Sequence, residues 1–434
     1  MEYPIPKGVF DILPEEPQKE DAWRNSNHWQ YLEGVIRELA REYGYREIRT
    51  PIFERTELFV RSVGESSDIV SKEMYTFNDK AERSLTLRPE GTAPVIRSFV
   101  EKQLHTQRPV QKFFYIGPMF RYERPQAGRY RQHHQFGAEA IGVCSAEQDV
   151  ELIDLLTELY RRLGLKNLKV ALNTVGDANT RAQYREALQT HFQQYLPRLS
   201  SDSQARFSRN IMRILDSKAP EDQEAIAAAP SILDFLSSEA RAHFEKVCAL
   251  LTTIGLDWEV SPRLVRGLDY YNHTVFEISS SQLGAQNALG GGGRYDGLIA
   301  TLGGPDLPSV GFATGLERVL QAMEKQGMQF PPDPRPFIYF IPLGDRAREE
   351  CMKWTTALRH VHIPAEIDLS GKKIQTCLQT ANLLHTVFCL VLGEDELRSG
   401  QAQLKEMDTH HSKQIALDDL VGHIIRSYQR KITP

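Results

Sequence analysis

Apolar residues recur every three or four positions over residues 28–43, the spacing of an amphipathic helix: Trp29, Leu32, Val35, Ile36, Leu39 and Tyr43. Gly44 is placed to end this helix. Residues 46–51 then predict a short strand, and Pro51 suits an edge or an interface because proline cannot donate to a central ladder. The chain therefore opens with a helix–strand unit.

The pattern of apolar and polar residues changes twice in the middle of the chain. Apolar and polar residues alternate from about Phe113 to Gly142 around a basic, glycine-containing segment, which predicts an antiparallel hairpin with a long functional loop. Residues 178–255 are patterned as helices throughout and predict a compact insertion. Strand patterning returns over Ser261–Ile278, followed by a predicted turn over residues 290–297 and a helix over Glu317–Lys325. A core split around a helical insertion is expected.

The C-terminal part reads as a separate α/β unit. The proline-rich segment at residues 329–336 favours an extended linker. Beyond it, apolar runs at 337–343, 364–367 and 386–392 alternate with helical stretches at 346–359 and 373–383. The expected boundaries are 1–177 and 257–328 for the split core, 178–256 for the insertion, and 337–434 for the last domain.

Composition narrows the class of protein. The 434 residues are 41% apolar and 25% charged, which is typical of a globular enzyme and excludes a disordered or fibrous chain. The longest apolar runs reach only strand length, so no membrane span is expected. The N-terminus lacks a secretory pattern and the five cysteines are scattered, so we expect a cytoplasmic protein with reduced thiols and no metal site. The net charge of −5 means that any RNA partner must be held by local basic patches.

Several arginines stand beside glycines or aromatic residues: Arg121, Arg129, Arg266, Arg294 and Arg318. A partly buried guanidinium requires an anion, and its planar fork suits phosphate or carboxylate oxygens, so these groupings indicate a multiply anionic ligand. Neither a P-loop nor a strand–G-x-G-x-x-G–helix unit is present, which excludes the two commonest nucleotide-binding folds. An antiparallel scaffold that holds ATP with arginines remains.

The residues that carry these arginines resemble a known family. The stretch from Phe120 to Gln135, FRYERPQAGRYRQHHQ, resembles the second signature motif of class II aminoacyl-tRNA synthetases, and Val310–Arg318 resembles the third. Pro51 fits the first, which lies at the dimer interface in that class. Three further stretches, 87–93, 264–271 and 292–297, resemble segments that distinguish histidyl-tRNA synthetases. The likeness extends over essentially the whole chain.

The resemblance implies a fold and a reaction. The fold is an α+β catalytic core, an antiparallel sheet flanked by helices, with a helical insertion and a C-terminal α/β anticodon-binding domain. The reaction is histidine–tRNA ligation: ATP, with Mg²⁺, activates L-histidine to histidyl-adenylate, and histidine then passes to tRNA(His). A homodimer is implied, and the insertion is expected to brace the acceptor arm of the tRNA.

The resemblance also assigns roles to individual residues. Arg121 is expected on the α-phosphate of ATP, and Arg266 is expected to bridge that phosphate and the histidine carboxylate. Cations are needed there because the carboxylate, itself an anion, attacks the negatively charged α-phosphate. Arg129 and Arg318 are expected on the outer phosphates, with Arg318 also stacking on adenine. Glu123 and His133 complete the expected ATP site. His133 replaces the usual phenylalanine beside adenine, and its ring can also stack.

The histidine site is implied in the same way. Glu90, Thr92 and Gln135 are expected to accept hydrogen bonds from the α-ammonium group. Glu139 and Tyr271 are expected on the two ring nitrogens, since a neutral imidazole has one donor and one acceptor, and Tyr295 is expected as a wall of the pocket.

Other interpretations remain open. The main alternative is a non-catalytic histidine-sensing paralogue such as the regulatory subunit of ATP phosphoribosyltransferase, which is expected to lack the C-terminal domain and several charged site residues. A bare tRNA-binding role is a third possibility, but it leaves the arginines unexplained. The segment Gly371–Lys373, at a predicted helix start, is a candidate contact for RNA phosphate, and a solvated helix start is an equal alternative.

Overall fold

The computed structural model describes residues 3–64, 67–123, 128–280 and 288–432. It divides into two compact units, Met1–Pro331 and Pro332–Pro434, and each is described by itself. The division falls inside the proline-rich segment expected to be a linker.

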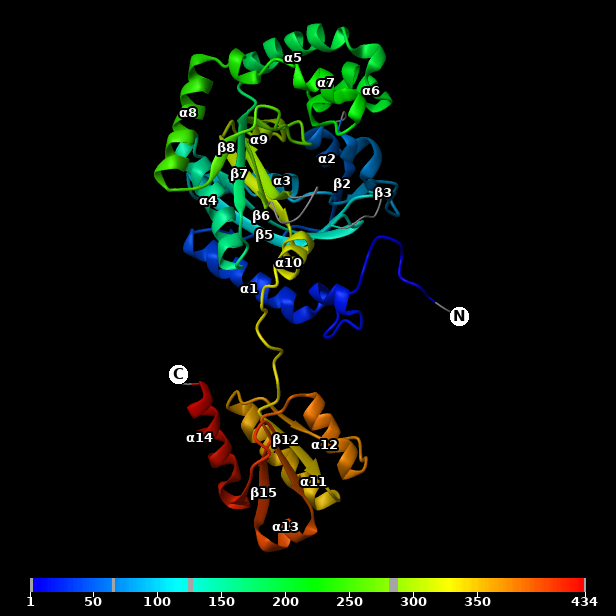
Figure 1. Ribbon diagram of the computed structural model, residues 1–434, viewed down its shortest axis with the longest axis vertical. Helices are drawn as coiled ribbons and strands as arrows, with labels where there is room; N and C mark the ends of the chain where they lie inside the picture. Colours follow the sequence, from blue (N-terminus) through cyan, green and yellow to red (C-terminus); the bar gives the residue numbers. More distant parts are fainter. Residues whose placement is uncertain (1–2, 65–66, 124–127, 281–287, 433–434) are drawn as a thin grey trace. The chain divides into compact units, whose positions relative to one another are not determined.

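The first unit is built on a mainly antiparallel sheet of eight strands in the order β1-β5-β6-β11-β10-β9-β7-β8 (Figure 1). The strands are β1 (Arg46–Glu47), β5 (Gln111–Phe120), β6 (Gln132–Ile141), β7 (Leu168–Thr174), β8 (Trp258–Val260), β9 (Asn272–Ser280), β10 (Ala288–Arg294) and β11 (Ser309–Gly315). Only the pairs β1·β5 and β7·β8, at the two edges, are parallel. A smaller sheet of three strands lies in the same unit: β2 (Phe53–Arg55), β4 (Ser84–Leu87) and β3 (Tyr75–Asn78). The antiparallel core that the sequence predicts is confirmed.

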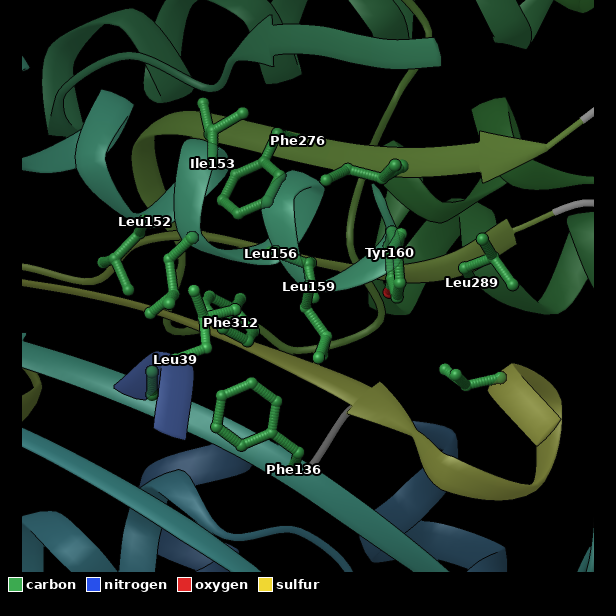
Figure 2. Packing of buried hydrophobic residues seen from close by; sticks show 14 of the residues in the cluster. Leu39, Phe136, Leu152, Ile153, Leu156, Leu159, Tyr160, Phe276, Leu289 and Phe312 are labelled. Carbon is green, nitrogen blue, oxygen red and sulfur yellow. The ribbon is translucent and has the colours of Figure 1, made fainter. Parts of the chain in front are cut away.

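Helices pack on both faces of the large sheet. Helices α1 (Ser26–Glu42), α4 (Ala146–Arg162) and α10 (Leu316–Lys325) share one hydrophobic cluster with it, and α3 (Thr92–Glu101) and α9 (Leu298–Thr301) share a second. Helix α2 (Thr56–Val63) packs against α3, α9 and the small sheet. Leu156 and Leu159 of α4 lie beside Phe136, Phe276 and Phe312 of three strands (Figure 2). This cluster stabilises the sheet on which the candidate site is built, because removing large buried side chains of this kind costs several kcal/mol of folding free energy.

The amphipathic helix predicted over residues 28–43 is α1, and its apolar stripe is buried. Gly44 follows it with φ +79°, a conformation that glycine adopts without strain. The predicted strand at 46–51 shrinks to Arg46–Glu47, an edge strand, and Pro51 lies outside it. The predicted hairpin is β5 and β6, paired from Gln111 with Ile141 to Phe120 with Gln132.

The segment predicted to be a helical insertion, residues 178–256, is mostly helical. Its helices are α5 (Ala178–Gln193), α6 (Ser201–Arg209), α7 (Gln223–Ala227) and α8 (Ser238–Thr253), and the short 3-10 helix Ile211–Asp216 follows α6. Tyr184, Leu188 and Phe192 belong to a hydrophobic cluster centred on this segment. Phe244, Val247 and Leu251 of α8 instead pack into the cluster of the catalytic core, so the last helix of the insertion is anchored on the sheet.

Two local predictions are wrong. The strand expected over Ser261–Ile278 begins only at Asn272, and residues 261–271 form a loop. The turn expected over residues 290–297 is strand β10 as far as Arg294. The glycines are needed there because neighbouring strands approach closely: a Cβ on Gly292 would lie 2.0 Å from the Gly311 carbonyl oxygen.

The second unit is a five-stranded sheet in the order β13-β12-β14-β15-β16. Its strands are β12 (Ile338–Pro342), β13 (Ala365–Ile367), β14 (Phe388–Leu392), β15 (Gln401–Glu406) and β16 (Ser412–Ala416), and its helices are α11 (Asp345–His360), α12 (Ile374–Leu383), α13 (Glu394–Ser399) and α14 (Leu420–Ile432). The three predicted strands are β12, β13 and β14, which run parallel. The unit has its own hydrophobic core, as a separate α/β domain requires. Gly371–Lys373 precedes α12 as predicted.

Candidate active site

Glu90 and Thr92 lie at the N-terminal end of α3. The Glu90 carboxylate accepts hydrogen bonds of 2.8 Å from the backbone nitrogens of Thr92 and Ala93. Burial raises the pKa of Glu90, and the two backbone donors oppose that rise. The helix start therefore holds an oriented, buried acceptor.

Glu139, on β6, is fully buried beside this helix start. Its Oε1 accepts a hydrogen bond of 2.7 Å from Thr92 Oγ1, and its Oε2 accepts one from the Tyr295 hydroxyl. Burial raises the pKa of Glu139 to about 8 although both hydroxyls favour the charged form. Glu139, Thr92 and Tyr295 thus form one connected group, drawn from β6, α3 and the end of β10.

Tyrosine rings surround this group. Tyr270 lies 4.7 Å from Tyr271 and 5.6 Å from Tyr295 between ring centroids. Tyr115, on β5, fits between two glycines, since a Cβ on Gly91 or Gly137 would lie 2.2 Å from its ring. Its buried hydroxyl has no partner of good geometry among the residues described. The sequence reasoning missed Tyr115 and Tyr270, and the two glycines that make room for Tyr115 become recognisable as its neighbours only in the fold.

Gln135 lies four residues before Glu139 on the same strand, paired with Gly117 and Gly315. Its Oε1 is buried and has no hydrogen-bond partner within the described part of the chain. A buried acceptor without a donor is costly, so this atom is prepared for a ligand N–H group.

A cavity of about 660 Å³ lies beside the tyrosine group and carries most of the predicted ATP-site residues. Its walls include Arg121, Glu123, Arg129, Arg318 and Glu277. Arg121, on the wall of this cavity, donates from Nε to the Pro89 carbonyl oxygen at 2.8 Å, in the residue before Glu90, so one side of the cavity lies next to the helix start that holds Glu90. A cavity lined by this many guanidinium groups suits a phosphate chain.

Backbone carbonyl oxygens and the Glu123 carboxylate hold the guanidinium groups of the cavity. Arg318, at the start of α10, donates to the Gly128 and Ala288 carbonyl oxygens at 3.2 and 2.8 Å. Glu123 Oε2 lies 3.4 Å from Arg129 Nη1 and its Oε1 lies 3.9 Å from Arg121 Nη1. Glu123 thus faces two arginines of the segment between β5 and β6.

His133 lies on β6 near Arg121. Removal of the ring from water lowers its pKa to about 3, and the nearby Arg121 charge adds to that effect. The ring is therefore neutral at physiological pH. Its neighbour His134 is directed elsewhere: its backbone nitrogen and Nδ1 both meet the Glu317 carboxylate. In the part of the chain that the structure covers, no three His, Cys, Asp or Glu side chains are grouped to hold a metal ion.

Arg266 lies on the loop before β9. Its Nη1 is 3.1 Å from Glu277 Oε2, and it would be 3.1 Å from a Cβ on Gly291, so the glycine strand makes room for the guanidinium. Its Nε is buried without a partner among the described residues. Glu277 was missed by the sequence reasoning, and its signal is a single acid within the apolar run of β9.

Arg294 differs from the other arginines. It is only 1% exposed and donates from Nε and Nη2 to Asp149 Oδ1 on α4, at 3.0 and 2.6 Å. Its anion therefore belongs to the protein, and the expectation of an external anionic ligand fails for this residue. A buried pair of this kind, once formed, is costly to break.

Of the residues that the sequence singled out for the histidine site, Thr92 and Tyr295 donate hydrogen bonds to Glu139, and the Thr92 backbone donates to Glu90. Gln135 lies on the same strand as Glu139, and Tyr271 lies beside Tyr270. Of those singled out for the ATP site, Arg121, Glu123, Arg129 and Arg318 line the cavity, Arg266 is paired with Glu277 on its wall, and His133 lies near Arg121. Among the residues described, no helix is long and apolar enough to cross a bilayer.

Comparison with known proteins assigns both units. The family described as Histidyl-tRNA synthetase matches residues 8–319, and the Anticodon binding domain matches residues 338–427. The chain is 55% identical over 420 residues to Histidine--tRNA ligase of Protochlamydia amoebophila, covering 97% of this chain and 99% of that protein. It superimposes on apo S. aureus histidyl-tRNA synthetase with a TM-score of 0.81 at 39% identity, covering 98% of this chain and all of that one.

A more distant likeness shares the fold alone. An ATP phosphoribosyltransferase regulatory subunit/histidyl-tRNA synthetase from Bacillus halodurans C is 21% identical, with a TM-score of 0.63. The full-length identity to ligases is more than twice as high, and the anticodon-binding unit is present. With its core and its C-terminal unit both matched, this chain belongs to the histidyl-tRNA synthetase family.

Proposed function

We propose that this chain joins L-histidine to the 3′ end of tRNA(His) in two steps. In the first, a carboxylate oxygen of histidine attacks the α-phosphorus of ATP, and pyrophosphate leaves with the electron pair of the broken P–O bond. In the second, the terminal ribose 3′-hydroxyl of the tRNA attacks the carbonyl carbon of histidyl-adenylate, and AMP leaves.

The proximity of two unlike environments carries this proposal. A buried group of carboxyls and tyrosines suits a small substrate with an ammonium and an imidazole, and the nearby cavity, lined by several arginines, suits a triphosphate. The Arg121 guanidinium joins the two, since it lines the cavity and donates to the carbonyl oxygen of the residue before Glu90.

In the histidine site, Glu90, Thr92 and Gln135 accept the α-ammonium group. The buried acceptor atoms of Glu90 and Gln135 support this role. Glu139 and Tyr271 bind the two ring nitrogens, with Tyr295 as a wall. A site built on paired hydrogen bonds rejects analogues that lack the partner atoms, because its polar groups are then left unpaired.

In the ATP site, Arg121 holds the α-phosphate and Arg266 bridges it to the histidine carboxylate. Two anions must approach each other in this step, so cations on both lower the barrier. Arg129 and Arg318 hold the outer phosphates, Arg318 and the neutral ring of His133 contact adenine, and Glu123 orients the loop arginines. The unpartnered Nε of Arg266 supports an additional anionic partner there.

ATP is expected to enter with Mg²⁺. Glu123 and Glu277 supply carboxylate oxygens on the wall of the arginine cavity, and Mg²⁺ is usually held by one or two carboxylates together with substrate phosphates. Bound there, the cation would offset negative charge on the phosphate chain.

The second step brings in the tRNA. The C-terminal unit is the part proposed to bind the anticodon, with Lys372 and Lys373 as candidate phosphate contacts. Within the site, no side chain is assigned as the base for the 3′-hydroxyl, and the adenylate phosphate oxygen is proposed to take its proton. We place the reaction in the cytoplasm, with the chain acting as a homodimer.

Charging of purified tRNA(His) with labelled histidine tests the proposal. Histidine should be attached to tRNA(His) and not to a tRNA of another identity. Arg266→Ala should slow adenylate formation by about 100-fold or more, the scale seen when an electrostatic contact to a transition state is removed. Adenylation within a few-fold of wild type would remove the role assigned to Arg266, and adenylate formation without charging would contradict the second step.

A further inference from the structure

The loop at residues 263–271, here called the Arg266 loop, has no regular secondary structure. Its arginine makes one ion pair, with Glu277, and its Nε is buried without a partner in the described residues. The position of the guanidinium therefore depends on what holds the backbone of the loop. A displacement of about 1 Å at such a group is enough to lower a rate about 100-fold.

The helical insertion holds the Arg266 loop at several points. Each of the following hydrogen bonds joins the loop to the insertion: Arg213 Nη1 to Gly267 O at 3.1 Å, Arg181 Nη1 to Tyr271 O at 2.7 Å, Asn210 Nδ2 to Asp269 Oδ1 at 2.8 Å, and Arg263 Nη2 to Ala227 O at 2.9 Å. Leu264, Val265 and Tyr271 also pack against the hydrophobic cluster of the insertion. The loop that carries Arg266 is thus fastened to the insertion along its length.

Arg213 has the central place in this arrangement. Its side chain is 15% exposed, and its Nη2 lies 3.3 Å from Asp68 Oδ2. Asp68 immediately precedes the short π-helical segment Ile69–Glu73, whose residues line the arginine cavity. The Arg213 guanidinium therefore links the Arg266 loop to a second wall of the cavity. Its contact in the loop is Gly267, the residue directly after Arg266.

We propose that Arg213 of the helical insertion is a positioning residue for Arg266, so that the insertion takes part in histidine activation before any tRNA is bound. The inference rests on the proposed function and extends it. Arg213 is itself on the wall of the arginine cavity, and the role proposed for it is through the Gly267 carbonyl oxygen rather than through a phosphate. It acts by fixing the backbone from which Arg266 reaches the carboxylate and the α-phosphate.

Arg213→Ala tests the proposal, with Arg209→Ala as the matched control. Arg209 is an exposed arginine one turn earlier in the chain. In histidine-dependent ATP–pyrophosphate exchange without tRNA, Arg213→Ala should lower kcat/KM for histidine by about tenfold or more, while Arg209→Ala should stay within about twofold of wild type. Arg213→Lys keeps a cation that can donate to Gly267, so it should recover part of the loss.

Backbone amide hydrogen exchange gives a readout that does not depend on activity. Arg213→Ala should speed exchange within residues 263–271 and leave strands β6 and β11 unchanged. If Arg213→Ala fails to fold, Asn210→Ala removes a second fastening of the same loop and should show the same pattern more weakly.

Unchanged kcat/KM for histidine in the folded Arg213→Ala protein would overturn the proposal, whatever the hydrogen exchange shows. Failure of the proposed function looks different, because wild type itself would then give no histidine-dependent exchange of pyrophosphate. In that case unchanged amide exchange in residues 263–271 would overturn the positioning role as well.

Discussion

Two buried carboxyls, Glu90 and Glu139, have different surroundings although both are hydrogen-bonded to Thr92. Glu90 accepts two backbone N–H groups at a helix start, whereas Glu139 accepts two side-chain hydroxyls. Burial is the largest cause of the raised pKa in both, and it brings the pKa of Glu139 to about 8. Environment, rather than residue type, therefore gives these acids different properties.

The raised pKa of Glu139 predicts a pH-dependent stability of the ligand-free protein. In the unfolded chain this carboxyl ionises near its ordinary value of 4.5, and in the folded chain near 8. Its contribution is fully present below about pH 4.5 and is lost as the pH rises to about 8, because the unfolded state releases the proton first. Over this window the free energy of unfolding should fall by up to about 1.4 kcal/mol per pH unit through Glu139 alone.

Glu139→Gln removes this titration and keeps an acceptor for one hydroxyl. Urea unfolding at pH 5 and pH 8 measures the difference in free energy of unfolding between variant and wild type. The free energy of unfolding of the variant should increase relative to that of wild type as the pH rises. An equal difference at both pH values would show that Glu139 does not titrate as described.

At the scale of single residues, the sequence identified the side chains proposed to contact substrate better than the side chains that pack behind them. Arg121, Glu90 and Arg318 lie in distinctive motifs, so they could be found. Tyr115 and Asp149 could not, because a buried tyrosine or a lone aspartate in a helix is unremarkable until the fold brings Gly137 or Arg294 against it.

At the scale of elements, strand β10 explains an error of the sequence analysis. Consecutive glycines usually mark a turn, and here they form a central strand because β9, β11 and Arg266 approach too closely for any side chain. Periodicity cannot reveal this, since it reports which side chains are buried and a glycine has none. The same limit explains residues 261–271, where an apolar run packs against the insertion rather than into the sheet.

Gly292→Ala tests the close approach. Its Cβ would lie 2.0 Å from the Gly311 carbonyl oxygen, so the strands must separate, and the melting temperature should fall by about 5 °C or more. Gly315→Ala is the control, because a Cβ there meets nothing within 4 Å and its φ is −83°. Differential scanning calorimetry makes the comparison, and equal melting temperatures for the two variants would contradict the packing argument.

At the scale of the whole molecule, an exposed apolar surface on the small sheet is suited to contact a second copy of the chain. Ile52, Phe53 and Phe77 are each about half exposed, and the rings of Phe53 and Phe77 lie 6.5 Å apart. Exposed apolar clusters of this kind commonly mark protein interfaces. This surface follows Pro51, which the sequence analysis placed at a dimer interface.

If the proposed homodimer forms through this surface, Phe53→Lys should raise its dissociation constant by about tenfold or more, because a charge would replace a ring that the contact covers. Ile254→Lys is the control, since Ile254 is 46% exposed and lies outside the small sheet. Sedimentation equilibrium over a concentration series measures both. A dimer of unchanged stability in Phe53→Lys would exclude this surface as the interface.

The central claim is that the buried carboxyl–tyrosine group and the arginine cavity together activate histidine. The measurement that tests it most directly is ATP–pyrophosphate exchange with each of the twenty amino acids, with Mg²⁺ and without tRNA. Exchange with histidine alone is the predicted result. Tight histidine binding without exchange, or exchange with a different amino acid, would contradict it.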